Sequence, residues 1–355
     1  MNKIKHLSVT RKIDYATYAG VILAFAAVTI LQRLDMVSRS MEGMLIPICC
    51  YVVMAVSLNL TVGILGELSL GHAGFMSVGA FSGVIAAMSL RDMLPSEPLR
   101  LAVSMVVGAL FAVVASFVVG IPVLRLRGDY LAIVTLAFGE IIKEIMNCLI
   151  VGFDSKGLHI ALNISGTVTI DSLGLDETGY AIIKGAQGAT GTDKIATFTA
   201  GFILVMITLV VVLNLVRSRA GRAILAIRDN RIAAESVGIN ITKYKMMAFV
   251  TSAALAGAAG TLYGLNYSNM AAAKFDFNTS ILVLVFVVLG GLGRIWGSVI
   301  AAVVLYVLPE ALREFADYRM LVYAIVLILV MLATNTPAVR SMVGKMIPRR
   351  SKGGA

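Results

Sequence analysis

Long apolar runs without charged residues recur along this chain of 355 residues. Residues 18–31, 101–124 and 321–333 contain no Asp, Glu, Lys or Arg. About 20 such residues form a helix long enough to cross the ~30 Å hydrocarbon core of a bilayer. The pattern therefore predicts an all-α, polytopic transmembrane helical bundle.

Charged positions divide the apolar sequence into about ten predicted spans, or eight to ten if short segments are discounted. They cover residues 16–34, 43–62, 68–90, 101–124, 130–150, 196–216, 244–266, 280–292, 295–309 and 320–335. The segments 280–292 and 295–309 are each only about 20 Å long as helices. They are half-helices around a binding site, thin or tilted spans, or two parts of one kinked span. A stripe of small residues at Gly257, Gly260 and Gly264 predicts close helix packing.

The composition fits a membrane protein. Hydrophobic residues make up 59% and charged residues 14% of the chain, whereas soluble domains average about half apolar and a quarter charged. The net charge of +10 lies in short segments beside apolar runs, without the aromatic residues that stack on nucleic-acid bases. It therefore suits lipid headgroups rather than nucleic acid. The three cysteines lack the spacing of metal ligands and are expected to be reduced packing residues.

The placement of basic residues predicts an orientation. Lys and Arg are concentrated in the N-terminal segment 1–15, at 125–127, in 217–245 and in the tail 336–355, which the positive-inside rule places in the cytoplasm. Both termini are then cytoplasmic, and the transmembrane domain covers 16–335, with a small periplasmic excursion at 151–195 that could contain a hairpin. The first span is expected to stay uncleaved because it is longer than a signal peptide's apolar region, which is the alternative.

Between two predicted spans, residues 217–243 alternate apolar and charged residues in the manner of short amphipathic helices. Gly238 is placed to end such a helix. We expect the segment to lie along the cytoplasmic face, where it could dock in a groove of a soluble subunit while its basic residues contact lipid. A solvated linker is the alternative.

Polar residues at membrane depth are the candidates for a translocation pathway. The stretch 66–75 places Glu, Ser and His among small residues, and ionisable groups at that depth usually face a cavity or a partner. Helix packing alone would select the same glycines. Glu140 and Lys143 have the spacing of a helical ion pair, which favours a structural role over ion coupling. The pathway candidates are Ser69, Gly71, His72, Gly74, Thr135 and Glu140; no metal site is predicted.

The sequence has no phosphate loop with its lysine, no HExxH zinc motif and no nucleophile elbow. We therefore assign no catalytic residue and do not expect an enzyme.

Four stretches, taken in order and spacing, resemble the M-type permease subunits of bacterial branched-chain amino-acid ABC transporters. They are GELSLGHAGF at 66–75, LRGDYLAIVTLAFGE at 126–140, residues 221–245 with AIRDNRIAAESVG at 226–238, and VLGGLGRIWG at 288–297. Together they cover about residues 45–333. Each is weak alone, but all four in order are specific to the family.

The resemblance implies a permease of the bacterial cytoplasmic (inner) membrane that moves branched-chain or related amino acids inward. Its implied partners are a second, H-type permease, two cytoplasmic ATPase subunits, a periplasmic binding protein and membrane lipid. The chain itself would bind no cofactor, and ATP would be hydrolysed on the ATPase subunits. The resemblance, with the charge pattern, assigns coupling to the ATPase to Arg228, Asp229, Ala233, Ala234, Glu235 and Gly238.

Two alternatives remain at this level. The chain departs from the family pattern at residues 151–157 and 334–340 and has a long loop up to Lys194, so urea, amides or other small solutes are alternative substrates. A self-sufficient, ion-coupled secondary transporter is an alternative of another class. Its candidate ion-binding or proton-relay residues are Glu67, His72, Glu140 and Glu144.

Overall fold

The structure is a computed structural model of the chain, and it describes residues 9–34, 38–124, 126, 128–154, 157–163, 173–174, 176, 179–312, 324–325 and 328. Contacts divide the chain into two units, Met1–Ala302 and Val303–Ala355, and the arrangement given below is that of the first. The α-helices are α1 (Val9–Arg33), α2 (Arg39–Asn59), α3 (His72–Ser89), α4 (Glu97–Val123), α5 (Asp129–Cys148), α6 (Phe198–Arg217), α7 (Arg219–Asp229), α8 (Arg231–Ser236), α9 (Ile241–Gly264), α10 (Phe277–Gly290) and α11 (Ile295–Ala311).

Most of the described chain is helical, as predicted. Six helices are long and apolar enough to cross a membrane: Arg39–Leu65, His72–Ser89, Glu97–Val123, Phe198–Arg217, Ile241–Gly264 and Ala272–Gly290. Two shorter apolar helices are Thr17–Arg33 and Ile295–Glu310. The predicted span 130–150 is present as α5 but is not among these apolar helices. The predicted span 320–335 lies outside the described residues apart from 324–325 and 328.

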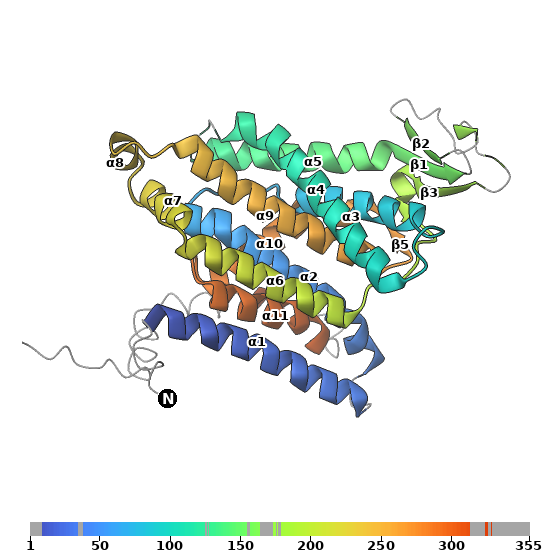
Figure 1. Ribbon diagram of the computed structural model, residues 1–355, viewed down its shortest axis with the longest axis horizontal. Coiled ribbons are helices and arrows are strands. Elements are labelled where there is room, and N and C mark those ends of the chain that lie inside the picture. The colour runs from blue at the N-terminus through green and yellow to red at the C-terminus, as the bar shows by residue number, and fades with distance from the viewer. Residues whose placement is uncertain are drawn as a thin grey trace, which may run out of the picture. The chain divides into compact units, whose positions relative to one another are not determined.

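The helices α2, α3 and α9 form the interior of the first unit (Figure 1). The most apolar windows of the corresponding spans are 89%, 78% and 72% buried, against 28% for α4 and 39% for α6. Close approach at glycines makes this packing possible. A Cβ atom at Gly79 of α3 would lie 2.1 Å from the carbonyl oxygen of Gly257 on α9, and one at Gly260 would lie 2.0 Å from the carbonyl oxygen of Met76. The predicted small-residue stripe is therefore a packing surface.

The predicted cytoplasmic segment 217–243 lies at one end of the helices, which we call the α7 end. Residues 63–67, 219–245 and 291–294 meet there through the contacts of Arg228 and Lys245 described below. Figure 1 shows α7 and α8 at this end and the β-strands at the opposite end, which we call the sheet end.

The sheet end carries a five-stranded sheet of order β2-β1-β3-β4-β5. Its strands are β1 (Leu149–Asp154), β2 (Gly157–Leu162), β3 (Tyr180–Lys184), β4 (Ala189–Thr190) and β5 (Asn269–Met270). Burial raises the pKa of Tyr180, whose hydroxyl donates a 3.0 Å hydrogen bond to the carbonyl oxygen of Met88 at the end of α3. The strands are thereby tied to the helices.

This sheet corrects the all-α prediction. The expected hairpin in 151–195 exists as β1 and β2, paired antiparallel from Leu149 with Leu162 to Asp154 with Gly157. Residues 164–172 of the predicted excursion lie outside the described residues. β1 follows α5 without a break and continues its apolar sequence, so it was counted as part of the predicted span 130–150. β5 is two residues long and pairs with β4 across a large separation in sequence, which no local pattern indicates.

A turn at residues 291–294 separates α10 from the start of α11. Gly291 and Gly293 in the connection have φ angles of 93° and 77°, in the left-handed region that glycine adopts without strain. A Cβ atom at Gly290 would lie 2.5 Å from the carbonyl carbon of Gly297, so the two helices touch through their backbones beside the turn.

Candidate functional sites at an interrupted helix and a helix pair

The helix α2 does not end as an ordinary helix but continues into a π-helical turn, Leu60–Leu65. Gly66 closes the turn with a φ angle of 81°, and residues 66–71 then run without helical structure until α3 begins at His72. Short π-helical segments in α-helices are rare and are frequent at functional sites.

The irregular segment 66–71 re-enters the helix bundle. The His72 Nε2 atom lies 2.8 Å from the Ser57 hydroxyl, and Ser57 precedes Leu65, the end of the π-turn, by eight residues. At 1.5 Å per residue, this places the start of α3 about 12 Å inside the end of the preceding helix. Irregular backbone at such depth is tolerated only where protein or a cavity surrounds it.

Side chains of other helices satisfy the backbone of this segment. The hydroxyl of Thr135 on α5 accepts a 3.1 Å hydrogen bond from the Leu70 amide. The hydroxyl of Ser280 on α10 accepts a 3.2 Å hydrogen bond from the Ala73 amide. The unpaired amides at the start of α3 thus draw α5 and α10 onto it.

The structure places five of the six predicted pathway residues at or beside this junction. Gly71 and Gly74 face α5: a Cβ atom on Gly71 would lie 2.1 Å from the carbonyl oxygen of Thr135, and one on Gly74 would lie 3.0 Å from the Cα of Gly139. Ser69 is 3% exposed, and its hydroxyl has no hydrogen-bond partner among the described residues. His72 instead points to Ser57 on α2.

Glu140, the sixth predicted residue, has a structural role and joins α5 to α10. It forms the expected ion pair with Lys143, and its second carboxylate oxygen accepts a 3.1 Å hydrogen bond from the amide of Phe277 at the start of α10. This carboxylate links α5 to α10, as favourable charge at a helix N-terminus does.

The seam between α3, α5 and α10 is closed. The space between these helices is too narrow for a water molecule. It is lined by Leu70, Gly74, Leu136, Gly139, Glu140, Phe275, Asp276, Phe277 and Ser280. In this conformation Gly71 and Gly74 therefore serve close helix packing and do not line an open pathway. A solute could pass along the seam only if the helices separated.

The predicted amphipathic segment forms two short helices, α7 and α8, as expected. Buried Ile224 and Ile227 hold α7 against the bundle. Ala234 is 3% exposed and packs with Ile227 and with Ile241 at the start of α9. The predicted stop is also confirmed: Gly238 has a φ angle of 80°, and its amide donates a 3.0 Å hydrogen bond to the carbonyl oxygen of Glu235.

The outer surface of this helix pair mixes apolar and charged side chains. Ile232 is 81% exposed and Val237 is 75% exposed, and Asp229, Ala233 and Glu235 are exposed around them. This mixture of exposed apolar and charged side chains is what an amphipathic helix presents to a groove of a partner. These two residues were not among the predicted coupling residues, although their apolar character beside charged neighbours was visible in the sequence.

Arg228 at the end of α7 connects the helix pair to the interrupted helix. Its Nη1 donates a 3.1 Å hydrogen bond to the carbonyl oxygen of Gly63 inside the π-turn. Its aliphatic stem covers Gly66, where a Cβ atom would lie 2.7 Å from the Arg228 Cγ. A π-turn leaves backbone carbonyls without their usual helical partners, and the guanidinium supplies one.

Asn59 links the π-turn to the α10–α11 turn and was missed by sequence reasoning. It is fully buried; its amide nitrogen donates a 2.8 Å hydrogen bond to the Ser298 hydroxyl, and its carbonyl oxygen accepts one of 2.8 Å from the Gly293 amide. A lone amide side chain inside the apolar run 43–62 was the available signal, because polar groups at such depth are expensive.

Lys245 and Glu67 form a second connection at the α7 end. Lys245, in the first turns of α9, is 3% exposed in its side chain and pairs with Glu67, which is 18% exposed and lies in the irregular segment. The ion pair binds the segment that re-enters the bundle to the helix that follows α8. Lys245 had been counted only as a basic residue of the cytoplasmic loop.

We predict that Lys245→Met lowers the free energy of unfolding by about 2 kcal/mol, because Glu67 is left with its charge largely buried and unpaired. The double variant Lys245→Met/Glu67→Gln is expected to recover most of that loss. Thermal unfolding of the detergent-solubilised chain measures both. Equal stabilities of the single and double variants would show that the pair contributes nothing specific.

These features define an integral membrane transport protein: a packed helical bundle with an interrupted, re-entrant helix connected to a helix pair outside the spans. The sequence model of the family described as "Branched-chain amino acid transport system / permease component" matches residues 40–331. The chain belongs to this family. The resemblance on which the sequence prediction rested is thereby confirmed.

Individual relatives agree with the family. The chain is 34% identical over 312 residues to the high-affinity branched-chain amino acid transport system permease protein LivM of Escherichia coli K12, covering 84% of this chain and 69% of that protein. It is 33% identical to LivM of Salmonella typhimurium over 312 residues, which again cover 84% of this chain and 69% of that protein. It is 29% identical to the permease protein BraD of Pseudomonas aeruginosa, covering 81% of this chain and 90% of that protein. No solved structure matches the chain.

Proposed function

We propose that this chain is the membrane-spanning subunit of an ABC importer in the bacterial cytoplasmic membrane, and that it moves branched-chain or related amino acids inward. ATP is hydrolysed on two separate cytoplasmic ATPase subunits, and a second, H-type permease and a periplasmic binding protein complete the assembly. The family and the named substrates of LivM and BraD support this function. The observation that carries the mechanism is the Arg228 contact, which joins a helix pair of docking character to the interrupted helix.

In this mechanism the α7–α8 pair docks on an ATPase subunit through Ile232, Val237 and the charged residues around them. Movement of the pair pulls on the π-turn through Arg228, and Asn59 passes the displacement to the α10–α11 turn. Both connections act on the helices that flank the closed seam. Separation of α3, α5 and α10 would then expose Ser69, Gly71, Gly74 and Thr135 to the solute.

The proposed topology has ten spans with both termini in the cytoplasm. Its support is the placement of loops: the basic segment 217–243 lies at the α7 end, and the predicted periplasmic excursion 151–195 contacts α3 and α4 at the sheet end. Residues 217–243 then face the ATPase subunits, and the sheet faces the binding protein.

Uptake by the assembled transporter tests the proposal. Proteoliposomes with both permeases and both ATPase subunits are expected to accumulate labelled leucine only with ATP and the binding protein present. An ATPase subunit that cannot hydrolyse ATP provides the control. In the same vesicles, a cysteine placed at position 222 should react with a membrane-impermeant reagent only from the ATPase side. Uptake that persists without the ATPase, or a label from the opposite side, would contradict the proposal.

The four candidate ion-binding or proton-relay residues do not support the alternative of a secondary transporter. Glu67 is paired with Lys245, Glu140 and Glu144 both contact Lys143, and His72 is bonded to Ser57. Each of these ionisable groups has a structural partner in this conformation, so none is held ready to bind an ion.

A further inference from the structure

A cleft at the sheet end is separate from the seam and from the helix pair. It has a volume of about 400 Å³ and is lined by Arg91, Pro95, Glu97, Arg100, Asp193, Lys194 and Ile195. These residues come from the connection between α3 and α4, the first turn of α4, and the segment that leads into α6. The volume lies in the range of small-ligand sites, about 300–1,000 Å³.

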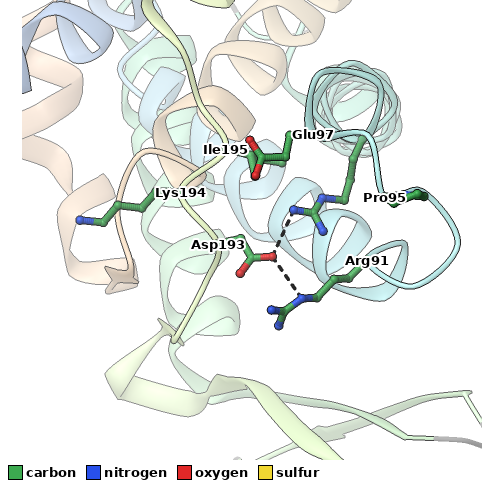
Figure 2. Close-up of a pocket in the computed structure, with 7 residues that line it drawn as sticks. Arg91, Pro95, Glu97, Asp193, Lys194 and Ile195 are labelled. Carbon is green, nitrogen blue, oxygen red and sulfur yellow. Dashed lines mark hydrogen bonds and ion pairs between the residues drawn. The ribbon is translucent and has the colours of Figure 1, made fainter.

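Two guanidinium groups of the cleft share one carboxylate. Asp193 Oδ2 accepts a 3.1 Å contact from Arg100 Nη2 and a 3.5 Å contact from Arg91 Nε, drawn as the two dashed lines in Figure 2. A guanidinium has five N–H donors, and the two groups have one carboxylate oxygen of Asp193 as their shared partner among the described residues.

Arg100 is the unusual member, because its side chain is only 6% exposed. Its Nε atom is buried and has no hydrogen-bond partner among the described residues. An unsatisfied buried donor is costly and requires an explanation. The Nε atom has no accessible surface, so a ligand in the cleft would meet the outer nitrogens of this permanently charged group, which favour an anion.

The cleft also offers a negative group. The carboxylate of Glu97 lies on the far side of Asp193 from Arg91 in the view of Figure 2, and the Lys194 side chain points away from both guanidinium groups. Apart from Lys194, the charged groups that line the cleft are two guanidinium groups and two carboxylates, which balance. A ligand with one carboxylate alone would meet Glu97 with repulsion, whereas a zwitterion would place its ammonium there.

We propose that this cleft binds a free α-amino acid, with the carboxylate at Arg100 and Arg91 and the ammonium at Glu97. This inference rests on the proposed function, because it takes the chain to be part of an importer of amino acids. The lining is mostly polar and charged, so the site recognises the main-chain groups that all α-amino acids share rather than a branched side chain. On the proposed topology it is a periplasmic site at which the solute is held before or beside translocation.

Isothermal titration of the solubilised full-length chain tests the site directly. L-leucine is expected to bind, whereas L-leucinamide, which lacks the carboxylate, and 4-methylpentanoate, which lacks the ammonium, should bind at least about tenfold more weakly. Arg100→Lys keeps the charge beside Asp193 but removes the planar fork of guanidinium donors, and should weaken leucine binding about tenfold or more, the effect of losing one charged hydrogen bond. Lys184→Gln, on β3 and outside the lining of the cleft, is the matched control and should leave binding unchanged.

Arg91→Gln provides a second variant that leaves the buried Arg100 pair in place, and it should also weaken binding. No heat from leucine with the wild-type chain, or equal binding of leucine and leucinamide, would overturn the site. Variants that weaken only the complex with the binding protein, and not leucine binding, would overturn it in favour of a protein carboxylate. Because binding is measured on the isolated chain, a negative result here is distinct from a failure of ATP-driven uptake.

Discussion

Arg228→Ala is expected to lower ATP-driven uptake by between about tenfold and a hundredfold while the protein still inserts and folds. The variant removes a charge-assisted hydrogen bond from Nη1 to the Gly63 carbonyl oxygen and the stem that covers Gly66. A coupling free energy of about 1–3 kcal/mol corresponds to that range of effect. ATP hydrolysis by the assembled variant should persist, because the proposed function places the nucleotide sites on other subunits.

The controls separate geometry from charge. Arg222 is exposed on the same helix, so Arg222→Ala removes a positive charge from α7 without touching the π-turn and should leave uptake within about twofold. Arg228→Lys retains the charge but not the planar fork of donors, and should restore uptake only in part. Normal uptake by Arg228→Ala, or full rescue by lysine, would contradict a positional link. The exposed Arg228–Asp229 pair, 38% and 69% exposed, should matter little.

Gly79→Ala is expected to destabilise the fold by about 3 kcal/mol or more, although it adds a single methyl group. The new Cβ would lie 2.1 Å from the Gly257 carbonyl oxygen and 2.3 Å from its Cα. These are backbone atoms at the crossing of α3 with α9, so the helices themselves must move apart. Thermal unfolding in detergent should show a large loss of stability and poor recovery of monodisperse protein.

Gly43→Ala is the matched control for this substitution. Gly43 lies in α2, and a Cβ there meets nothing within 4 Å. The same methyl group should raise stability slightly, by about 0.5–1 kcal/mol, because alanine restricts the unfolded chain and favours helix. Similar effects of the two substitutions would show that the α3–α9 contact is not close-packed in the protein.

The six long apolar helices of the described chain could be predicted because each is determined locally. An apolar run of sufficient length forms a helix in a bilayer whatever its neighbours, since every backbone group must be satisfied within the segment. The same local logic predicted the helix pair and its stop at Gly238, where a left-handed residue is required. It failed at β5, a strand of two residues that depends on pairing with β4.

The candidate site was predicted in its parts but not in its connections. The residues Gly71, Gly74 and Thr135 were selected for their size and polarity, and only the packing of α3 on α5 puts them in one seam. Arg228 was selected as a charge on an amphipathic helix. Its partner is a backbone carbonyl 165 positions away in sequence, and a carbonyl group has no signature in the sequence.

The sequence alone determined that this is a membrane protein, how charge is distributed over its loops, and which family it belongs to. Hydropathy, charge and the order of motifs can be read from short segments. Tertiary structure alone decided where the helix α2 unwinds, what Arg228 and Asn59 hold, and that Arg100 lies buried beside Asp193 with a donor unpaired. Each of these depends on atoms from distant segments, and the free energy of bringing such atoms together belongs to the packed bundle as a whole.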